Sequence, residues 1–222
     1  MQHGRCGADA GPHRTKGRVS ASELLALGTA TVGEAWPPAR LLVAPILPLA
    51  PSMSLAGRAL TVRCRSGDNL ALHRAIAVAK PGDVLVVDYG GSLDSGPFGE
   101  IMALACQMRG IAGLVIDGAV RDSAHIAALG FPVFAKGLNI LGTAKQDSGV
   151  IGGVLSLGGV EIATGDLILA DADAILVVKA ADMQAALAAS LARTAREAEI
   201  MERLRKGETT LSILGLSTET SA

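Results

Sequence analysis

Three short apolar runs, separated by stretches of helical periodicity, constrain the fold of this chain more than any other feature. The runs are "DVLVVD" (83–88), "AGLVID" (112–117) and "FPVFA" (131–135), each bounded by Gly, Pro or Asp. Unbroken Val, Ile, Leu and Phe are typical of strands buried on both faces of a parallel sheet. Because crossovers between parallel strands are right-handed, this order predicts a right-handed βαβαβ unit.

Helical patterns fill the two gaps between these runs. The first helix is predicted to begin at about Glu100, after the loop "GGSLDSGPFG", and to stop at Gly110. Its apolar face is predicted from the spacing i, i+3, i+4 and i+7 of Ile101, Leu104, Ala105 and Met108. The second helix is predicted to begin at Asp122 or Ser123, which are natural N-cap residues, and to end at Gly130.

The remaining segments predict a second layer. Residues 152–178 alternate and turn like β structure, and residues 181–207 form a long, charge-studded helical pattern. Residues 41–57 are apolar but interrupted by three prolines, which predicts an extended segment and not a membrane-spanning helix. The predicted fold class is α/β, with a mostly parallel central sheet and a second, partly antiparallel layer.

Composition narrows the possible partners and the location. The chain has 222 residues, 50% of them hydrophobic, with 27 glycines and a mean hydropathy of +0.41, so we expect an oligomer. A net charge of −1 and 2% aromatic residues argue against nucleic acid as a partner. Residues 1–19 lack a signal-peptide core and are predicted to be a disordered extension of a single cytoplasmic domain, 20–222. Of the three cysteines, Cys64 and Cys106 are expected to be small core residues.

Two strand-to-helix turns are expected to face one crevice, "GPFGE" (96–100) and "GAVRD" (118–122), because ligands of parallel sheets bind beyond the carboxyl ends of the strands. The amides from Gly99 to Met102 suit a carboxylate, and the Arg121 guanidinium suits a carboxylate or a developing enolate oxygen. Asp122 and Glu100 offer hard oxygen ligands for Mg²⁺ or Mn²⁺. Together these groups predict a site for a small 2-oxo acid chelated to a metal.

A purely structural interpretation of the same residues stays open. Arg121 and Asp122 would then form a local ion pair, Asp122 would cap its own helix, and Glu100 would only favour a helix N-terminus. His125 borders the predicted crevice or lies on a helix surface. Lys136 and Lys179 are expected to be solvated and not Schiff-base nucleophiles.

Four motifs in series resemble the family of class II 4-hydroxy-4-methyl-2-oxoglutarate aldolases and the related RNase E activity regulator A (RraA). They are "GRALTVRC" (57–64), "AKPGDVLVVDYGG" (79–91), "FGEIMALACQMRGIAGLVIDGAVRD" (98–122) and "GFPVFAKG" (130–137). The resemblance extends from about Ser20 to Leu216. It implies a swivelling β/β/α-type domain assembled as a homotrimer or dimer of trimers, with active sites between subunits.

The resemblance also implies an activity, a retro-aldol cleavage that yields pyruvate, with oxaloacetate decarboxylation as a side activity. Arg121 would bind the substrate and steady the pyruvate enolate, Asp122 would ligate a divalent metal, and the amides of Gly99, Glu100, Ile101 and Met102 would hold the substrate carboxylate. Glu100 matches a position that is often Asp in the aldolases, which leaves substrate choice open.

A glutamate of the neighbouring subunit's C-terminal helix is a further family feature, and it best matches Glu197, with Glu199 as the competing choice. A solvated charge on an amphipathic helix remains the alternative for Glu197. The regulator lacks the aspartate that follows the arginine, whereas Asp122 is present here, so the resemblance favours an enzyme over a non-catalytic ring that binds a protein partner. The turn at Gly90 and Gly91 lacks the GxGxxG pattern of dinucleotide sites, and an S-adenosylmethionine site is also disfavoured.

Overall fold

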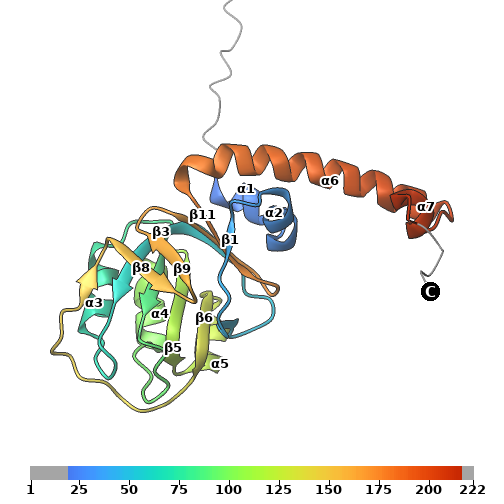
Figure 1. Ribbon diagram of the computed structural model, residues 1–222. Coiled ribbons are helices and arrows are strands. Elements are labelled where there is room, and N and C mark those ends of the chain that lie inside the picture. Colours follow the sequence, from blue (N-terminus) through green and yellow to red (C-terminus); the bar gives the residue numbers. More distant parts are fainter. Residues whose placement is uncertain (1–19, 217–222) are drawn as a thin grey trace, which may run out of the picture.

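The computed structural model describes residues 20–216, and its architecture is built on one large mixed sheet (Figure 1). Four parallel strands form the centre of this sheet, in the order β3, β4, β5, β6. Their bounds are β3 Leu55–Arg63, β4 Asp83–Asp88, β5 Gly113–Val120 and β6 Val133–Leu138. The predicted α/β class, with a parallel centre and an additional antiparallel layer, is confirmed.

Helices connect the central strands. They are α3 Leu70–Val78, α4 Glu100–Met108 and α5 Ser123–Leu129. The sequence predicted α4 and α5, and the structure adds α3 between β3 and β4. The α5 helix ends at Gly130, whose φ of 69° lies in the left-handed region that glycine adopts without strain. The order of strands and helices therefore confirms the βαβαβ unit predicted from the sequence.

The proline-interrupted segment is extended, as predicted, and it crosses from one edge of the sheet to the other. Its first strand, β1 Arg40–Leu41, pairs antiparallel with β11 at one edge. Its second strand, β2 Leu47–Pro48, pairs antiparallel with β6 at the opposite edge. Strands β1 and β2 thus pair with β11 and β6, which would otherwise expose unpaired backbone groups at the two edges of the sheet.

Strands β10 Leu167–Ala170 and β11 Ile175–Val178 are buried on both faces. Alternate side chains of these strands, such as Ile168 and Val177, join the main core, whereas Leu169 and Leu176 join a second cluster. Three helices cover that second cluster, α1 Ala21–Leu25, α2 Thr29–Ala35 and α6 Met183–Arg205. The period-2 alternation of the strands therefore supplies two cores, one on each face of the sheet.

Short elements complete the described chain. Strand β7 Val150–Ile151 pairs with the end of β3, and β8 Val154–Leu157 with β9 Val160–Ala163 forms a separate antiparallel hairpin. A 3₁₀ turn, η1 Ala180–Asp182, precedes the predicted long helix α6, and α7 Thr210–Leu214 lies at its far end (Figure 1). Within residues 20–216, no helix combines the length and apolarity needed to cross a bilayer. The predicted extension 1–19 lies outside the described residues.

Two predictions about the βαβαβ unit are wrong in detail. The strand predicted to end at Asp117 continues to Val120, after a register shift against β6 between Ile116 and Ala119. The loop before α4 lies beside the last residues of β5, where the Ala119 N–H donates to the Ser92 carbonyl at 3.2 Å. The "GAVRD" turn therefore begins at Arg121 and not at Gly118.

The predicted apolar face of α4 is the face that a single chain leaves exposed. Ile101 is 82% exposed and Met108 is 73% exposed. The helix instead buries the side chains of Met102, Ala103 and Cys106. Because "EIMALACQM" is apolar around most of its circumference, periodicity alone could not decide which face meets the sheet.

Candidate active site

The two turns that were predicted to face one crevice lie side by side, where β5 passes into α5 and where α4 begins, and we call the surface between them the crevice. The two turns are tied directly, since the Arg121 N–H donates to the Phe98 carbonyl at 2.9 Å. Phe98 itself is fully buried and stacks on Phe131 with ring centroids 6.2 Å apart. The ring thus holds the start of this turn in the core, and after buried Gly99 the chain reaches the surface at Glu100.

Asp122 has an unusual backbone and an unusual hydrogen bond. Its φ is 57°, the only positive φ of a non-glycine residue within residues 20–216. Its side chain does not cap its own helix α5, so the predicted cap is wrong. Instead its Oδ2 accepts the Glu100 N–H at 3.1 Å, the first amide of α4. The left-handed backbone therefore turns the Asp122 carboxylate away from α5 and towards the other turn.

Gly99 is required by the closeness of this contact. A Cβ at Gly99 would collide with the Asp122 carboxylate, and it would lie 3.0 Å from the Arg121 Cγ and Nε atoms. The backbone of Gly99 is extended, with φ near −146°, so space and not conformation excludes a side chain. Glycine thus lets the α4 turn approach both Arg121 and Asp122.

Arg121 and Asp122 form a loose pair that leaves both groups accessible. The Arg121 Nε lies 3.8 Å from the Asp122 Oδ2, beyond hydrogen-bond distance. Their side chains are 41% and 40% exposed. Most donors of the guanidinium and the second carboxylate oxygen therefore remain free to meet a ligand.

Glu100 and His125 border the same crevice. The His125 Nδ1 lies 3.9 Å from the Glu100 Oε2, and the two side chains are 70% and 47% exposed. The structure thus brings together Gly99, Glu100, Arg121 and Asp122, and it adds His125 on the neighbouring helix. His125 follows Asp122 by three residues, which is less than one helical turn, and this spacing was the reason to expect it at the border of the crevice.

The backbone amides of the α4 turn are used unequally. The Met102 N–H donates to the Gly99 carbonyl at 3.1 Å, and the Glu100 N–H is taken by Asp122. Within residues 20–216, no hydrogen bond occupies the N–H groups of Gly99 and Ile101. Of the four amides predicted to bind a carboxylate, these two are therefore the ones without a hydrogen-bond partner in the described part of the chain, and we call them the open amides.

A divalent metal would find two carboxylates here. Within the described chain, no group of three His, Cys, Asp or Glu side chains is arranged to hold an ion. Asp122 and Glu100 are hard oxygen donors and are accessible. Such a donor set fits Mg²⁺ or Mn²⁺, which hold one or two protein carboxylates and keep several waters, and does not fit zinc.

Glu197 lies elsewhere in the single chain. It is on α6, where its Oε1 lies 2.6 Å from the Arg193 Nε, and Arg193 also contacts Glu34 of α2. Figure 1 shows α6 passing over α1 and α2 and extending beyond the body of the domain, away from α4 and α5. The predicted role of Glu197, or of Glu199, therefore depends on a neighbouring subunit.

The other candidates have structural partners. Lys136 donates to Asp117 at 3.0 Å, and Lys179 donates to Asp166 at 2.7 Å, so the expectation that both lysines are simply solvated is wrong. The two core cysteines behave as predicted. Burial raises the pKa of the Cys64 thiol, and likewise that of Cys106, to about 12, so neither is a reactive nucleophile.

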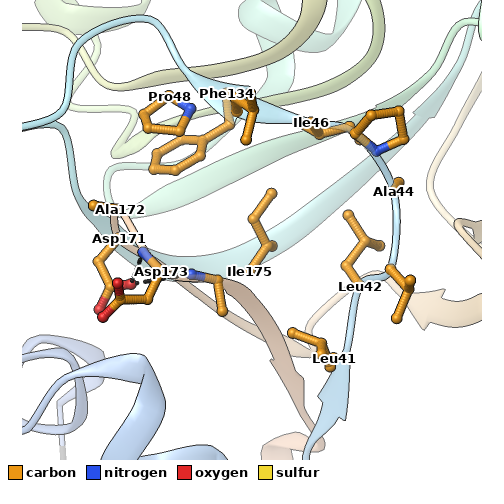
Figure 2. A pocket seen from close by; sticks show the side chains of 14 residues that line it. Leu41, Leu42, Ala44, Ile46, Pro48, Phe134, Asp171, Ala172, Asp173 and Ile175 are labelled. Carbon is orange, nitrogen blue, oxygen red and sulfur yellow. Dashed lines mark hydrogen bonds between the residues drawn. The ribbon is translucent and has the colours of Figure 1, made fainter.

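An apolar hollow of about 360 Å³ lies at the opposite end of the sheet (Figure 2). It is lined by residues 41–48, by Phe134 and by the β10–β11 turn, residues 171–175. Ala170 beside it pairs with Leu55, the first residue of β3, whereas the crevice lies beyond the last residues of β4 and β5. The hollow is therefore separate from the predicted chemistry.

Comparison with known proteins identifies relatives of this chain. The RraA-like model of the Aldolase/RraA family matches residues 29–177. A Halalkalibacterium halodurans protein named "Putative 4-hydroxy-4-methyl-2-oxoglutarate aldolase" is 42% identical over 137 residues, which are 62% of this chain and 65% of that protein. The match thus spans slightly less than two thirds of that relative.

Two solved structures resemble the domain. A protein from Geobacillus kaustophilus, described as an S-adenosylmethionine:2-dimethylmenaquinone methyltransferase, is 32% identical with a TM-score of 0.65 over 68% of this chain and 94% of its own. A Thermus RNA-processing inhibitor RraA is 29% identical with a TM-score of 0.64, over 68% and 91% of the two chains. Together with the matched residues, these similarities show that the chain belongs to the RraA-like family.

Proposed function

We propose that the protein is a divalent-metal-dependent lyase that cleaves 4-hydroxy-2-oxo acids, such as 4-hydroxy-4-methyl-2-oxoglutarate, to pyruvate, with oxaloacetate decarboxylase activity. The observation that carries this proposal is the Arg121–Asp122 pair turned onto the start of α4 by a left-handed aspartate. The aldolase name of the Halalkalibacterium halodurans relative supports the same reaction class.

Each group at the crevice has a part in that reaction. The open amides of Gly99 and Ile101, at the positive end of α4, bind the carboxylate of the 2-oxo acid. The Arg121 guanidinium lies beside them and donates to the 2-oxo oxygen. Asp122, with Glu100 nearby, would hold Mg²⁺ or Mn²⁺, which polarises that oxo group as a Lewis acid.

The chemistry needs charge stabilisation at one oxygen. In a retro-aldol step, the C4 hydroxyl loses its proton and C4 leaves as the carbonyl carbon of the second product. The electron pair of the broken C3–C4 bond forms the enolate of pyruvate, which is then protonated at C3. Oxaloacetate yields the same enolate when its C3–C4 bond breaks and C4 leaves as carbon dioxide. A planar guanidinium fixed beside the developing oxyanion is suited to stabilise both transition states.

A non-catalytic ring that binds a protein partner is the second candidate, supported by the similarity to the RNA-processing inhibitor. The accessible carboxylate of Asp122 favours the enzyme, since a protein-binding ring has no need of a strained metal ligand. Methyl transfer, named for the other structural relative, would need a nucleotide-binding turn, and the glycines at 90, 91 and 96 do not form GxGxxG.

The test is pyruvate release by the purified protein. Oxaloacetate and several 4-hydroxy-2-oxo acids are supplied with Mg²⁺ or Mn²⁺, and pyruvate is detected by a coupled assay. We expect EDTA to abolish the release and added metal to restore it, while borohydride with pyruvate traps no covalent adduct. Activity that survives exhaustive chelation would point instead to a Schiff-base lysine, and no release from any substrate would favour the ring that binds a partner.

We also propose that the protein works as a homotrimer or a dimer of trimers in the cytoplasm, with the crevice completed by a neighbour. The exposed stripe of α4, Ile101, Leu104 and Met108, starts beside the crevice, and Ile140 is 85% exposed. Covering such side chains is favourable, and the extending α6 is long enough to carry Glu197 to another subunit. Light scattering during size exclusion should give three or six chains, and a monodisperse monomer at micromolar concentration would contradict the role of Glu197.

A further inference from the structure

Asn69, at the start of α3, has a side chain that does not serve its own helix. It occupies the N-cap position, where asparagine usually accepts a hydrogen bond from the first turn, yet it makes no such bond. The preceding residue, Asp68, accepts a hydrogen bond from the helix start instead, since its Oδ1 accepts the Leu70 N–H at 2.9 Å. The Asn69 carboxamide is instead turned inwards, and the residue is only 5% exposed.

The inward carboxamide contacts the chain on both sides of Gly99, at Pro97 before it and at Met102 after it. The Asn69 Nδ2 donates to the Pro97 carbonyl at 2.8 Å, and it lies 3.7 Å from the Met102 Sδ. The next carbonyl, that of Phe98, accepts the Arg121 N–H. The peptide groups leading into α4 are therefore held from one side by Asn69 and from the other by the arginine of the crevice.

One atom of Asn69 shows that stability alone does not explain this arrangement. The Asn69 Oδ1 is buried and has no hydrogen-bond partner within residues 20–216. Turning the carboxamide over would not help, because it would place this oxygen against the Pro97 carbonyl. A buried acceptor without a partner is unfavourable, and it offsets part of what the hydrogen bond to the Pro97 carbonyl contributes to stability.

We infer that Asn69 is a positioning residue, which holds the Gly99–Met102 turn where its open amides meet the carboxylate of the 2-oxo acid. The inference rests on the proposed function for its ligand. Asn69 touches no reacting atom and acts through Pro97 and Met102. Because an error of about 1 Å in a binding group is enough to cost a large factor in rate, two contacts at the ends of the turn suffice for this effect.

Asn69→Leu keeps the volume and removes both the donor and the unpartnered oxygen. We expect its thermal midpoint to stay close to that of the wild type, because removal of the unpartnered oxygen offsets the loss of the donor to the Pro97 carbonyl. Amide hydrogen exchange at Met102 and Ala103, whose N–H groups donate to Gly99, should become about tenfold faster, and exchange elsewhere should not change. The KM for oxaloacetate should rise about tenfold, with a smaller change in kcat.

Asn139→Leu is the matched control. Asn139 also donates its Nδ2 to a carbonyl of the same loop, that of Leu93 at 2.7 Å, and its Oδ1 accepts the Leu141 N–H at 2.8 Å, so neither partner belongs to the α4 turn. Its loss should leave the exchange of the α4 turn and the KM within about twofold of the wild type. If Asn69→Leu does not fold, Asn69→Ser removes the same two contacts with a smaller side chain and is measured in the same way.

Two outcomes would overturn the inference. Asn69→Leu could keep wild-type exchange at Met102 and Ala103 together with a wild-type KM, or it could lose protection throughout the protein with a lower thermal midpoint. If the wild type releases no pyruvate, the proposed function fails, but the local exchange still decides whether Asn69 positions the turn.

Discussion

Two aspartates in this fold each accept the first amide of a helix that belongs to another part of the chain. Asp122 accepts the Glu100 N–H of α4 at the crevice. Asp171, in the β10–β11 turn at the opposite end of the sheet, accepts the Thr29 N–H of α2 at 2.9 Å. Carboxylates at helix N-termini are favourable in both places, so this contact alone does not separate structure from function.

The surroundings of the two carboxylates differ. Asp171 also accepts the Thr29 hydroxyl at 2.6 Å. It further accepts the backbone amides of Asp173 and Ala174 (Figure 2). The Asp122 carboxylate accepts one backbone amide in the described part of the chain, and the Arg121 guanidinium beside it lies beyond hydrogen-bond distance. The backbone of Asp122 is left-handed. A carboxylate saturated with donors has no oxygen left for a ligand, whereas one with few donors on a strained backbone is available for chemistry.

The largest expected effect is that of Asp122→Asn on turnover. Asparagine tolerates the left-handed backbone and still accepts the Glu100 N–H, but it loses the charge that a metal requires. We expect kcat for pyruvate release to fall by more than about a hundredfold, with a change in stability under about 1 kcal/mol. Steady-state kinetics and thermal melts at one fixed protein concentration measure both quantities.

Asp122→Gly sharpens this result, because glycine relieves the left-handed backbone while removing the carboxylate altogether. Its stability should also stay within about 1 kcal/mol of the wild type, since the relief and the lost hydrogen bond oppose each other. If either variant retained near-normal turnover, Asp122 would be a structural aspartate like Asp171.

Arg121→Lys should have the next largest effect. Lysine keeps the positive charge but replaces the planar fork with a single flexible ammonium. The loss of one preorganised donor to a developing oxyanion typically lowers kcat by about a hundredfold. Folding should be unaffected, because the Arg121 backbone N–H, and not the guanidinium, joins the crevice turns. A variant that lost stability but kept its kcat would assign the guanidinium to an ion pair.

Asp171→Asn should show the opposite behaviour. The amide group of asparagine would face one of the donors that Asp171 now accepts, which should cost about 2 kcal/mol of unfolding free energy, or about 5 °C in thermal midpoint. The kcat per folded protein should not change, since the turn lies at the other end of the sheet. A large loss of turnover in a well-folded Asp171→Asn protein would contradict the purely structural role of Asp171.

The same residue predicts how this stability depends on pH. Burial alone would raise the pKa of Asp171, but the Thr29 hydroxyl and amide, with two further amides, outweigh it and lower the pKa. The stabilisation is therefore complete above the unfolded pKa of about 3.9 and is lost as the pH falls through the lower folded value. The stability difference between the wild type and Asp171→Asn should narrow below about pH 4 in urea titrations.

Local patterns predicted the fold better than the orientation of its faces. The run "DVLVVD" predicted β4 to the residue, because Gly82 and the charged ends bound an unambiguous buried strand. For α4 the sequence is apolar on several sides, so the predicted face of Ile101 and Met108 was the wrong one within a single chain. Contacts with the sheet decided the orientation, and no local pattern contains them.

Residue types predicted the candidate site, but its geometry depended on contacts between distant segments. The order of Gly99, Glu100, Arg121 and Asp122 placed them on neighbouring turns, as observed. The left-handed backbone of Asp122 could not be read from the sequence, and it redirected the carboxylate from α5 to α4. Asn69 was missed because a polar residue before an apolar helix resembles an ordinary cap.

The most direct test of the account places Asp→Asn substitutions at Asp122 and Asp171 side by side and measures kcat for pyruvate release together with the thermal midpoint. We expect Asp122→Asn to lower kcat by more than about a hundredfold without a change in thermal midpoint. We expect Asp171→Asn to lower the thermal midpoint by about 5 °C without a change in kcat. Two variants that both kept the wild-type kcat would contradict the account, because Asp122 would then serve the fold alone.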